Sequence, residues 1–480
     1  MTGAWFDTTE YLVDGNWLAA PARLPVENPS TGETVGEIAR CGADQVDAAV
    51  AAAHAARAGE WGRMTAAERG RVLARIGALV AERAEDLARL ESLDVGKPLK
   101  QARADALALA RYCEFYAGAA DKLMGETIPY LDGYTVYTLR EPHGVTGHIV
   151  PWNYPMQIIG RSVGAALAMG NAAVLKPAEE ASLTALAFGR IAVDAGLPPG
   201  ALNIVPGLGE EAGAALSAHA GVQHLSFTGS VGVGQLIQAA AARNVVPVTL
   251  ELGGKSPQIV FDDADLDRAL PFLVNAGVQN AGQTCSAASR ILVQRGIHDQ
   301  VVARMAEAYR ALRVGPALDD LDVGPLISAR QRRVVQGYLD LADDLDIAAT
   351  GRIMDGARGG GHYIAPHLLA GATGGHRLAQ EEIFGPVQVV IPFDDEAEAL
   401  AIANGTEYGL VAAVWTENGA RALRMARAVR SGQVFLNNYG AGGGVELPFG
   451  GIGKSGHGRE KGFEALYGFS TLKTVAAWHG

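Results

Sequence analysis

The stretch Phe227-Thr228-Gly229-Ser230-Val231-Gly232-Val233-Gly234 leads from an apolar, strand-like segment through a glycine-rich turn into a helix-like segment. Glycines at such a turn let the backbone approach a ligand closely, and the N–H groups that open the helix can bind a pyrophosphate. The spacing differs from the G-x-G-x-x-G fingerprint, and a glycine turn before a helix is commonly only a turn. The stretch therefore predicts a strand, a turn and a helix. It indicates a dinucleotide site only if the neighbouring segments also form the strands and helices of a dinucleotide-binding sheet.

Short apolar segments alternate with helix-like segments on both sides of this turn. The expected strands are residues 145–150, 172–175, 202–205, 223–227 and 246–250. Such alternation is typical of a parallel sheet with right-handed crossovers, which binds dinucleotides at the carboxyl ends of its strands. A second alternating region, roughly 251–440, predicts another α/β domain.

The first part of the chain has a helical pattern. Apolar residues recur at three- and four-residue spacing between Val72 and Leu90, and the alanine-rich stretches 45–57 and 102–120 continue it. We expect this first segment to be helical and to serve packing. Residues 121–141 and the stretch 471–475 instead have β-prone alternation, and exposed edge strands invite pairing with another chain. A solvated hairpin and a frayed tail are the alternative.

Composition limits the class of partner. The 480 residues are 49% hydrophobic and include 61 glycines, which fits a large, well-buried α/β protein. The net charge of −12 comes from intermixed acids and bases, which argues against nucleic acid or an anionic membrane as partner. No apolar run approaches the ~20 residues of a membrane helix, and the acidic amino terminus is unlike an export signal, so we expect a cytoplasmic protein.

One of the three cysteines has a setting that suits chemistry. Cys41, Cys113 and Cys285 are widely spaced without metal-ligand pairing, so no metal site is expected. Cys285 lies in the small, polar stretch Gly282-Gln283-Thr284-Cys285-Ser286, which favours an accessible thiol. A lone intracellular cysteine is more often a small buried hydrophobe. Its candidacy as a nucleophile therefore depends on the residues that accompany it.

Three motifs follow one another along the chain: Pro151-Trp152-Asn153-Tyr154-Pro155, Glu251-Leu252-Gly253-Gly254-Lys255 and the Cys285 loop, with 34 residues between Glu251 and Cys285. In this order and with this spacing they resemble the NAD(P)-dependent aldehyde dehydrogenase superfamily. Four further stretches match in order: Lys176-Pro177-Ala178-Glu179, Phe227-Thr228-Gly229-Ser230, Glu381-Glu382-Ile383-Phe384-Gly385-Pro386 and Pro448-Phe449-Gly450-Gly451. The resemblance covers nearly the whole chain.

The resemblance implies an α/β fold with three parts. These are a Rossmann-type NAD-binding domain of residues 1–120 and 142–250, to which 447–467 return, an α/β catalytic domain of 251–446, and a small β oligomerisation arm of 121–141 and 468–480. The arm implies a homodimer or homotetramer.

The resemblance also assigns the chemistry. The Cys285 thiolate attacks a small-molecule aldehyde, because hydride leaves only after the carbon becomes tetrahedral. The Asn153 side chain and the Cys285 backbone N–H would stabilise the oxyanion. Glu251 would activate the water that hydrolyses the thioester, or deprotonate the thiol beforehand. Glu460 matches a position proposed to relay protons, with a solvated helix end as the alternative.

The implied cofactor is NAD, with NADP less favoured. Glu179 can accept hydrogen bonds from both ribose hydroxyls but would repel the extra phosphate of NADP. A surface Lys–Glu pair is the alternative reading of this stretch. The residues implied to contact the cofactor are Trp152, Lys176, Glu179, Gly229, Ser230, Glu382 and Phe384.

The substrate is less sharply indicated. Arg161 follows Asn153 by eight residues, at a position that lines the family's aldehyde tunnel. An arginine there can pair with a carboxylate or bond a phenolic oxygen, which favours an acid-bearing or aromatic aldehyde, whereas a structural ion pair is the alternative. Gln279 stands where semialdehyde enzymes carry a second arginine, which weakens a full carboxylate clamp. Tyr154, Gln157 and Phe449 would complete the lining, and the glycine-rich stretch 440–444 would leave room at the mouth.

Two other functions stay open. A CoA-acylating dehydrogenase would release the acyl group to CoA instead of water, and the presence of Glu251 argues against it. A non-catalytic binding or structural protein could keep the fold without activity, although every chemical position is filled.

Overall fold

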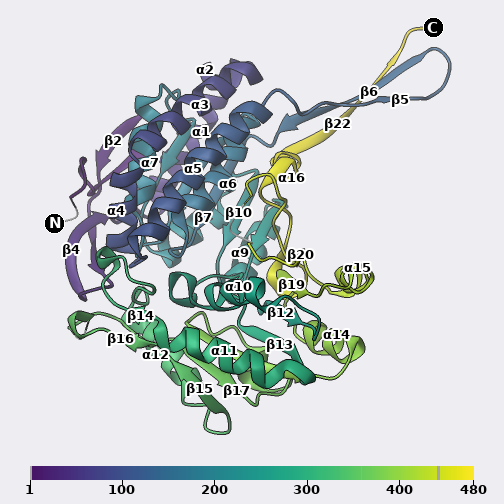
Figure 1. Cartoon of the computed structure of the whole chain (residues 1–480). Helices are drawn as coiled ribbons and strands as arrows, with labels where there is room; N and C mark the ends of the chain where they lie inside the picture. Colours follow the sequence, from purple (N-terminus) through teal and green to yellow (C-terminus); the bar gives the residue numbers. More distant parts are fainter. Residues whose placement is uncertain (1–2, 358, 441–443) are drawn as a thin grey trace.

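The computed structural model describes residues 3–357, 359–440 and 444–480, arranged as two α/β layers with a projecting arm (Figure 1). The first sheet runs in the order β2-β1-β9-β8-β7-β10-β11-β21. Its central strands pair in parallel. They are β7 (Val145–Val150), β8 (Ala172–Pro177), β9 (Leu202–Ile204), β10 (His224–Thr228) and β11 (Val248–Glu251). The alternation predicted from the sequence is confirmed, with strand ends shifted by one to two residues.

Helices with apolar faces cover this sheet (Figure 1). In α3, Thr65 and Glu68 form a capping box at the start, and Leu73, Ile76 and Val80 form the buried face. The helices are α1 (Ala43–Ala58), α2 (Glu60–Arg63), α3 (Ala66–Glu82), α4 (Ala84–Asp94), α5 (Leu99–Ala119), α6 (Pro155–Ala168), α7 (Leu183–Asp194), α8 (Ala214–Ala218) and α9 (Val231–Ala242). The helical pattern predicted from residue 45 onward is therefore confirmed.

The first 40 residues depart from the prediction, because they form strands and not helix. The strands are β1 (Glu10–Val13), β2 (Asn16–Ala19), β3 (Arg23–Asn28) and β4 (Glu33–Ala39). β1 and β2 form a hairpin whose turn residues, Asp14 and Gly15, have φ of 52° and 72°. An Asp-Gly pair at positive φ is typical of a tight hairpin turn. β1 also extends the first sheet by pairing with β9.

A second sheet follows, in the order β15-β17-β18-β13-β12-β19-β20. Its strands pair in parallel except β15, which is antiparallel to β17, so the second α/β region is confirmed. Its strands are β12 (Pro257–Val260), β13 (Arg290–Gln294), β15 (Asp346–Thr350), β17 (His367–Ala370), β18 (Val387–Phe393), β19 (Val411–Trp415) and β20 (Gln433–Leu436). Its helices are α10 (Leu266–Val278), α11 (His298–Ala311), α12 (Ala329–Leu339), α13 (Arg377–Gln380), α14 (Glu396–Asn404) and α15 (Gly419–Ala428). The short strands β14 (Arg313–Val314) and β16 (Arg352–Ile353) pair beside it.

The arm is a separate antiparallel sheet that extends away from both layers (Figure 1). It contains β5 (Thr127–Ile128), β6 (Tyr134–Pro142) and β22 (Ser470–Trp478), and β22 follows α16 (Gly462–Gly468). β22 pairs with β6 along its whole length, from Ser470 opposite Pro142 to Trp478 opposite Tyr134. Leu472 and Trp478 are 56% and 72% exposed.

The chain returns to the first sheet just before the arm. β21 (Gly456–His457) lies antiparallel to β11 and places Gly456 opposite Glu251. This return brings residues 445–461 beside the carboxyl end of β11. This return supports the domain boundaries predicted from the sequence. We therefore propose that residues 447–467 belong with the first sheet. Among the described residues, no helix is both long and apolar enough to span a bilayer.

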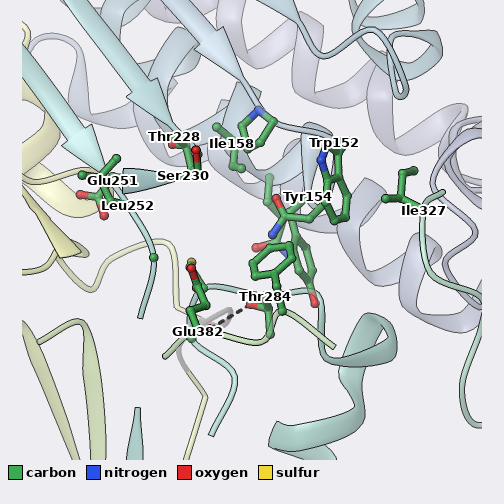
Figure 2. A pocket seen from close by; sticks show the side chains of 18 of the residues that line it. Trp152, Tyr154, Ile158, Thr228, Ser230, Glu251, Leu252, Thr284, Ile327 and Glu382 are labelled. Atoms are coloured by element: carbon green, nitrogen blue, oxygen red, sulfur yellow. Dashed lines mark hydrogen bonds between the residues drawn. The ribbon is translucent and has the colours of Figure 1, made fainter. Parts of the chain in front are cut away.

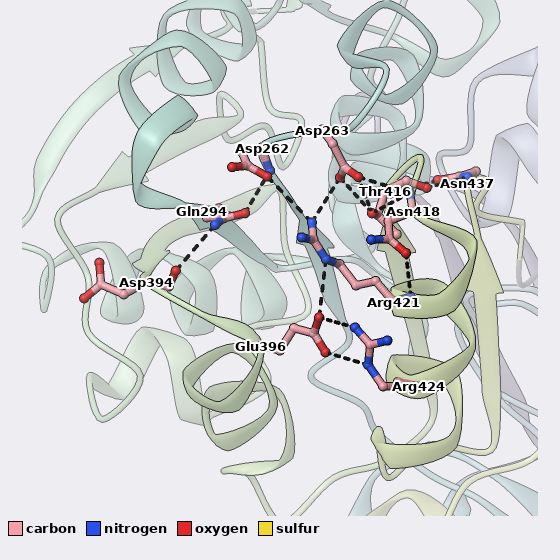
Figure 3. Close-up of polar contacts among 10 residues, drawn as sticks. All are labelled: Asp262, Asp263, Gln294, Asp394, Glu396, Thr416, Asn418, Arg421, Arg424 and Asn437. Carbon is pink, nitrogen blue, oxygen red and sulfur yellow. Dashed lines mark hydrogen bonds and ion pairs between the residues drawn. The ribbon is translucent and has the colours of Figure 1, made fainter.

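The strands of the second sheet have ion pairs at their carboxyl ends and loops that face the first sheet at their amino ends. A polar network around Arg421 closes the carboxyl edge (Figure 3). Arg421 pairs with Asp263 at 3.2 Å and with Glu396 at 3.4 Å, and Thr416 donates to Asp263 at 2.7 Å. The Arg421 guanidinium also lies over the Phe261 ring. Open parallel sheets usually bind ligands at the carboxyl edge, but here that edge holds the protein's own ion pairs. The loops at the opposite edge of this sheet face the first sheet's carboxyl ends.

Candidate active site

A cavity of about 450 Å³ lies between the two sheets. Its walls come from the loops after β7, β10 and β11 on one side and from the loops before β13, α12 and β18 on the other. In Figure 2, Glu251 and Thr228 lie at the left of the view, Trp152 and Ile327 at the right, and Thr284 and Glu382 below them. Residues that are far apart in the sequence therefore meet around one space.

The loop that carries Cys285 has an unusual backbone. Before it, Asn280, Ala281 and Gly282 have φ of 49°, 55° and 72°, all in the left-handed region. The Gln283 side chain fixes the loop, because its amide donates to the Asn280 carbonyl at 3.0 Å and its oxygen accepts the Ile327 N–H at 2.9 Å. Strained backbone of this kind persists where surrounding contacts hold it, often at functional sites.

Cys285 lines the cavity at the end of this loop. Burial raises the pKa of its thiol to about 12, while the nearby Arg161 charge opposes the shift. Glu382 and Glu251 add to the rise. The thiol is therefore mostly protonated at neutral pH and needs either a base or a cation to react as thiolate.

Asn153 is buried against the same loop. Its side-chain amide donates to the Gln283 carbonyl at 3.0 Å, and its own carbonyl accepts from Asn280 at the same distance. These two bonds tie the turn after β7 to the Cys285 loop. The predicted oxyanion donor and the predicted nucleophile thus lie on segments that hold each other in place.

Glu251 ends β11 and lines the cavity. Burial raises the pKa of its carboxyl well above the usual range, with Arg161 opposing the shift. Within the described residues neither carboxylate oxygen has a hydrogen-bond partner. A carboxylate without a hydrogen-bond partner and with a raised pKa takes up a proton more readily than an exposed glutamate does, which suits a general base.

Arg161 lines the cavity and makes an ion pair with Glu460. The two side chains meet at 2.5 Å and both are buried. Arg161 also donates to Thr228 at 3.1 Å, and Ser226 donates to Glu460 at 2.6 Å. Glu460 is therefore not a solvated helix end, and it lies behind the cavity wall. Both readings of Arg161 have a basis, because it faces the cavity and is already paired.

The other predicted substrate residues, Tyr154, Gln157, Gln279 and Phe449, also line the cavity. Gln157 donates to the buried Asp105 at 2.6 Å. Asp105 and Glu91 are ion-paired with Lys97, whose ammonium lies 3.9 Å from the centre of the Tyr154 ring. This buried group supports the lining from behind. Of the glycine-rich stretch 440–444, residues 441–443 lie outside the described residues.

The cofactor side of the cavity fits a dinucleotide. Thr228, Gly229 and Ser230 lie where α9 begins, and Ser230 caps that helix through a long bond of 3.4 Å to the Val233 N–H. A Cβ added at Gly232 would meet nothing within 4 Å, so there is open space beside the first turn of α9. The N–H groups of an accessible helix start can bind a pyrophosphate.

Glu382 and Phe384 lie across from α9. Glu382 accepts the Gly254 N–H at 2.9 Å through one oxygen, and burial raises the pKa of its carboxyl to about 7. Phe384 has a φ of 54° and packs edge-on against Trp152, with ring centres 5.4 Å apart. A Cβ at Gly253 would lie 2.2 Å from a Glu382 carboxylate oxygen, so a side chain at position 253 would displace this carboxylate.

Lys176 and Glu179 lie just outside the cavity and form an ion pair at 2.8 Å. Burial alone would raise the pKa of Glu179, but Lys176 lowers it, so the carboxylate is charged. Their neighbour Glu180 lines the cavity instead.

Sequence reasoning missed several residues that line the cavity, among them Tyr112, Glu180, Ser286, Ile327, Arg330, Gln331 and Lys461. Most come from segments without a motif, so only the fold brings them in. Lys461 directly follows Glu460, and burial lowers the pKa of its ammonium to about 7. Its position beside a motif residue was the only available signal.

The carboxyl edge of a dinucleotide-type sheet carries the buried Glu251 carboxyl and faces the Cys285 thiol across one cavity, an arrangement that suits a nicotinamide-dependent oxidoreductase. The aldehyde dehydrogenase family model matches residues 17–475. The chain belongs to the aldehyde dehydrogenase family.

Similar proteins agree with this assignment. A crystal structure described as a putative aldehyde dehydrogenase from Burkholderia cenocepacia is 61% identical, with a TM-score of 0.97, and the match covers 98% of this chain and 100% of that one. Betaine aldehyde dehydrogenase from Cereibacter sphaeroides is 42% identical over 97% of this chain and 96% of its own.

A structure of betaine aldehyde dehydrogenase from Staphylococcus aureus in complex with NAD+ is 34% identical, with a TM-score of 0.95 over 98% of this chain and 95% of that one. The protein is thus an NAD-dependent aldehyde dehydrogenase with the expected fold and cofactor.

Proposed function

We propose that the protein oxidises its aldehyde to the carboxylic acid through covalent intermediates on Cys285. The observation that carries this proposal is the shared cavity of Cys285 and Glu251, in which a thiol faces a buried carboxyl that has few fixed bonds. The Cys285 thiol releases its proton to water, a loss that the nearby Arg161 charge favours, and the thiolate sulfur then adds to the aldehyde carbon to give a thiohemiacetal oxyanion. The Asn153 amide and the Cys285 backbone N–H hold that charge, and each such donor is typically worth about 3 kcal/mol.

Bound NAD would supply the acceptor for the hydride that leaves this carbon. Ser230 and the start of α9 would hold its pyrophosphate, Lys176 and Glu179 the adenosine ribose, and Glu382 the nicotinamide-side ribose. Phe384 and Trp152 would form a wall beside the ring. The charged Glu179 supports NAD over NADP, because the extra phosphate would meet a carboxylate.

Hydrolysis completes the reaction. The resulting thioester loses its acyl group to water when Glu251 accepts a proton from that water. Glu460 would then pass the proton onward. Its contacts with Arg161 and Ser226 support a role in a buried hydrogen-bond chain, although the same contacts also suit a structural pair.

The test is to trap the acyl group. Glu251→Gln should keep the thiol and the cofactor site but stop hydrolysis, so mass spectrometry after brief reaction should find the acyl mass on the peptide with Cys285. Cys285→Ser should form neither NADH nor adduct. Adding CoA to the wild-type enzyme should leave the product a free acid, and formation of an acyl-CoA would support the CoA-acylating alternative instead.

For the substrate we propose an aromatic or acid-bearing aldehyde. Phe449 and Tyr154 offer aromatic surface in the cavity, and the Arg161 guanidinium also lines it. Several relatives are named as betaine aldehyde dehydrogenases, and the Arg161 charge would repel their cationic substrate. A comparison of kcat/KM for benzaldehydes, short semialdehydes, alkanals and betaine aldehyde tests this order.

We further propose that the arm assembles the chain into a homodimer or homotetramer in the cytoplasm. The exposed Leu472 and Trp478 on an unshielded antiparallel sheet support an interface there. Light scattering of the intact chain and of a Trp478→Ser variant would measure the change in mass.

A further inference from the structure

A buried lysine lies behind one wall of the cavity. Lys97 is in the short loop between α4 and α5, and its side chain is fully buried. Its ammonium pairs with Glu91 at 2.5 Å and also with Asp105. A buried ammonium needs such partners, because it has lost its hydration. None of these three groups lines the cavity or takes part in the proposed steps, so the position of this ion group beside the site needs its own explanation.

Two contacts link this ion group to the start of α6. The Lys97 ammonium lies 3.9 Å from the centre of the Tyr154 ring, and Asp105 accepts a hydrogen bond from the Gln157 amide at 2.6 Å. Tyr154 and Gln157 line the cavity, and Asn153 directly precedes Tyr154 in the chain. An ammonium is attracted to the face of an aromatic ring, and the attraction is stronger away from water. The contact therefore restricts the movement of the ring and of the adjoining backbone.

The same corner of the fold also holds the loop of the nucleophile. In the first turn of α5, the Gln101 side chain accepts the Asn280 N–H at 2.9 Å. Asn280 is the first residue of the left-handed stretch that leads to Cys285. The segment with the oxyanion donor and the loop with the thiol are thus both attached to the chain around Lys97, each by a different contact.

We propose that Lys97 is a positioning residue that keeps the Asn153 amide in place relative to the Cys285 thiol. The two carboxylates anchor the ammonium to α4 and α5, and the ammonium in turn fixes the Tyr154 ring at the start of α6. The oxyanion forms on a carbon that is bonded to the sulfur, so a shift of the amide relative to the sulfur weakens its stabilisation. This inference rests on the proposed function, because it requires the covalent adduct on Cys285.

The experiment compares three buried substitutions. Lys97→Met removes the ammonium but keeps a long side chain. Glu91→Gln alters the same ion group but leaves the Lys97 pair with Asp105 and the ring contact. Asp94→Asn is the control, because Asp94 is a buried carboxyl on α4 that accepts the Leu183 N–H at 3.0 Å and does not line the cavity. The probe is whichever benzaldehyde, semialdehyde or alkanal has the highest kcat/KM with the wild type.

Stopped-flow measurement at saturating aldehyde and NAD gives the rate of the NADH burst, and thermal unfolding gives the stability. Lys97→Met should slow the burst about ten- to a hundredfold, as expected when a catalytic amide is displaced by up to about 1 Å. The KM for NAD should stay at the wild-type value, because the cofactor residues make no contact with Lys97. Glu91→Gln and Asp94→Asn should lower the thermal midpoint but leave the burst rate close to that of the wild type.

An unchanged burst in Lys97→Met, or an equal loss in all three variants, would overturn the inference while leaving the proposed function intact. If Lys97→Met does not fold, Tyr154→Leu decides, because it removes the ring and leaves the ion group whole. A wild-type burst rate in Tyr154→Leu would then overturn the inference, and a slowed burst would support it. NADH formation by the wild type without any acyl adduct on Cys285 would instead count against the proposed function.

Discussion

Replacing Gly282 by Ala should disable the enzyme without unfolding it. A Cβ at this position would lie 2.1 Å from the Gly385 carbonyl oxygen and 2.7 Å from the Pro386 nitrogen. Real Cβ atoms essentially never come within 3.0 Å of such atoms, so the loops must separate by about 0.9 Å or more. The φ of 72° adds about 1–2 kcal/mol of strain for a residue with a side chain.

The separation moves the reacting groups. Gly282 lies three residues before Cys285, and Gly385 lies three residues after Glu382. A displacement of about 1 Å between catalytic groups can cost on the order of a hundredfold in rate, so we expect kcat/KM to fall by about that factor. Steady-state NADH formation measures the loss, and the midpoint of thermal unfolding shows whether the chain remains folded.

The matched control is Gly337→Ala in α12. A Cβ there meets nothing within 4 Å and the glycine lies inside an exposed helix, so activity should stay within about twofold, with a stability gain of about 0.5–1 kcal/mol. A Gly282→Ala enzyme with near wild-type kcat/KM would refute the reasoning, because it would mean that the two loops can separate without consequence.

Three further changes have definite expected outcomes. In the wild type the rate of acyl-enzyme hydrolysis should rise as pH increases through the raised pKa of Glu251, because only the ionised carboxylate accepts the proton. Stopped-flow traces of Glu251→Gln should show one NADH burst per site. Steady turnover by this variant would contradict the role of Glu251. Glu460→Gln leaves the Arg161 charge buried without its carboxylate and should cost about 3–5 kcal/mol of stability, seen as a lower thermal midpoint, whereas an unchanged midpoint would show that the pair contributes nothing. Glu179→Ala should raise kcat/KM with NADP relative to NAD by about tenfold, and an unaltered ratio would place the 2′-phosphate elsewhere.

Local patterns predicted the parallel layers well. The strands from β7 to β11 are short apolar runs between helical segments, and their buried positions are what the pattern encodes. The first strands were missed although β1 and β2 flank an Asp14-Gly15 pair, which is a recognisable hairpin signal between Leu12 and Trp17. The segment is short and partly exposed, so the longer helical pattern that follows it decided the interpretation of the whole first part of the chain.

Some residues of the candidate site could also be predicted from local motifs, and others could not. Cys285 and Glu251 could be proposed from motifs that the family shares, and the fold brings both to one cavity. The partner of Arg161 could not be foreseen, because Glu460 lies 299 residues away and meets it only when β21 returns to the first sheet. The same return of the chain brings Lys461 into the cavity wall. Contacts of this kind depend on topology, which no local pattern specifies.

The return of β21 also sets the order in which the protein can mature. Phe449, Glu460 and Lys461 leave the ribosome long after Cys285, so a nascent chain carries its thiol well before that thiol has a finished chamber. A fragment that stops near residue 440 would keep the sulfur and the base yet lack the strand that closes the edge beside them. The cavity around Cys285 is therefore complete only after the last part of the chain has joined the first sheet.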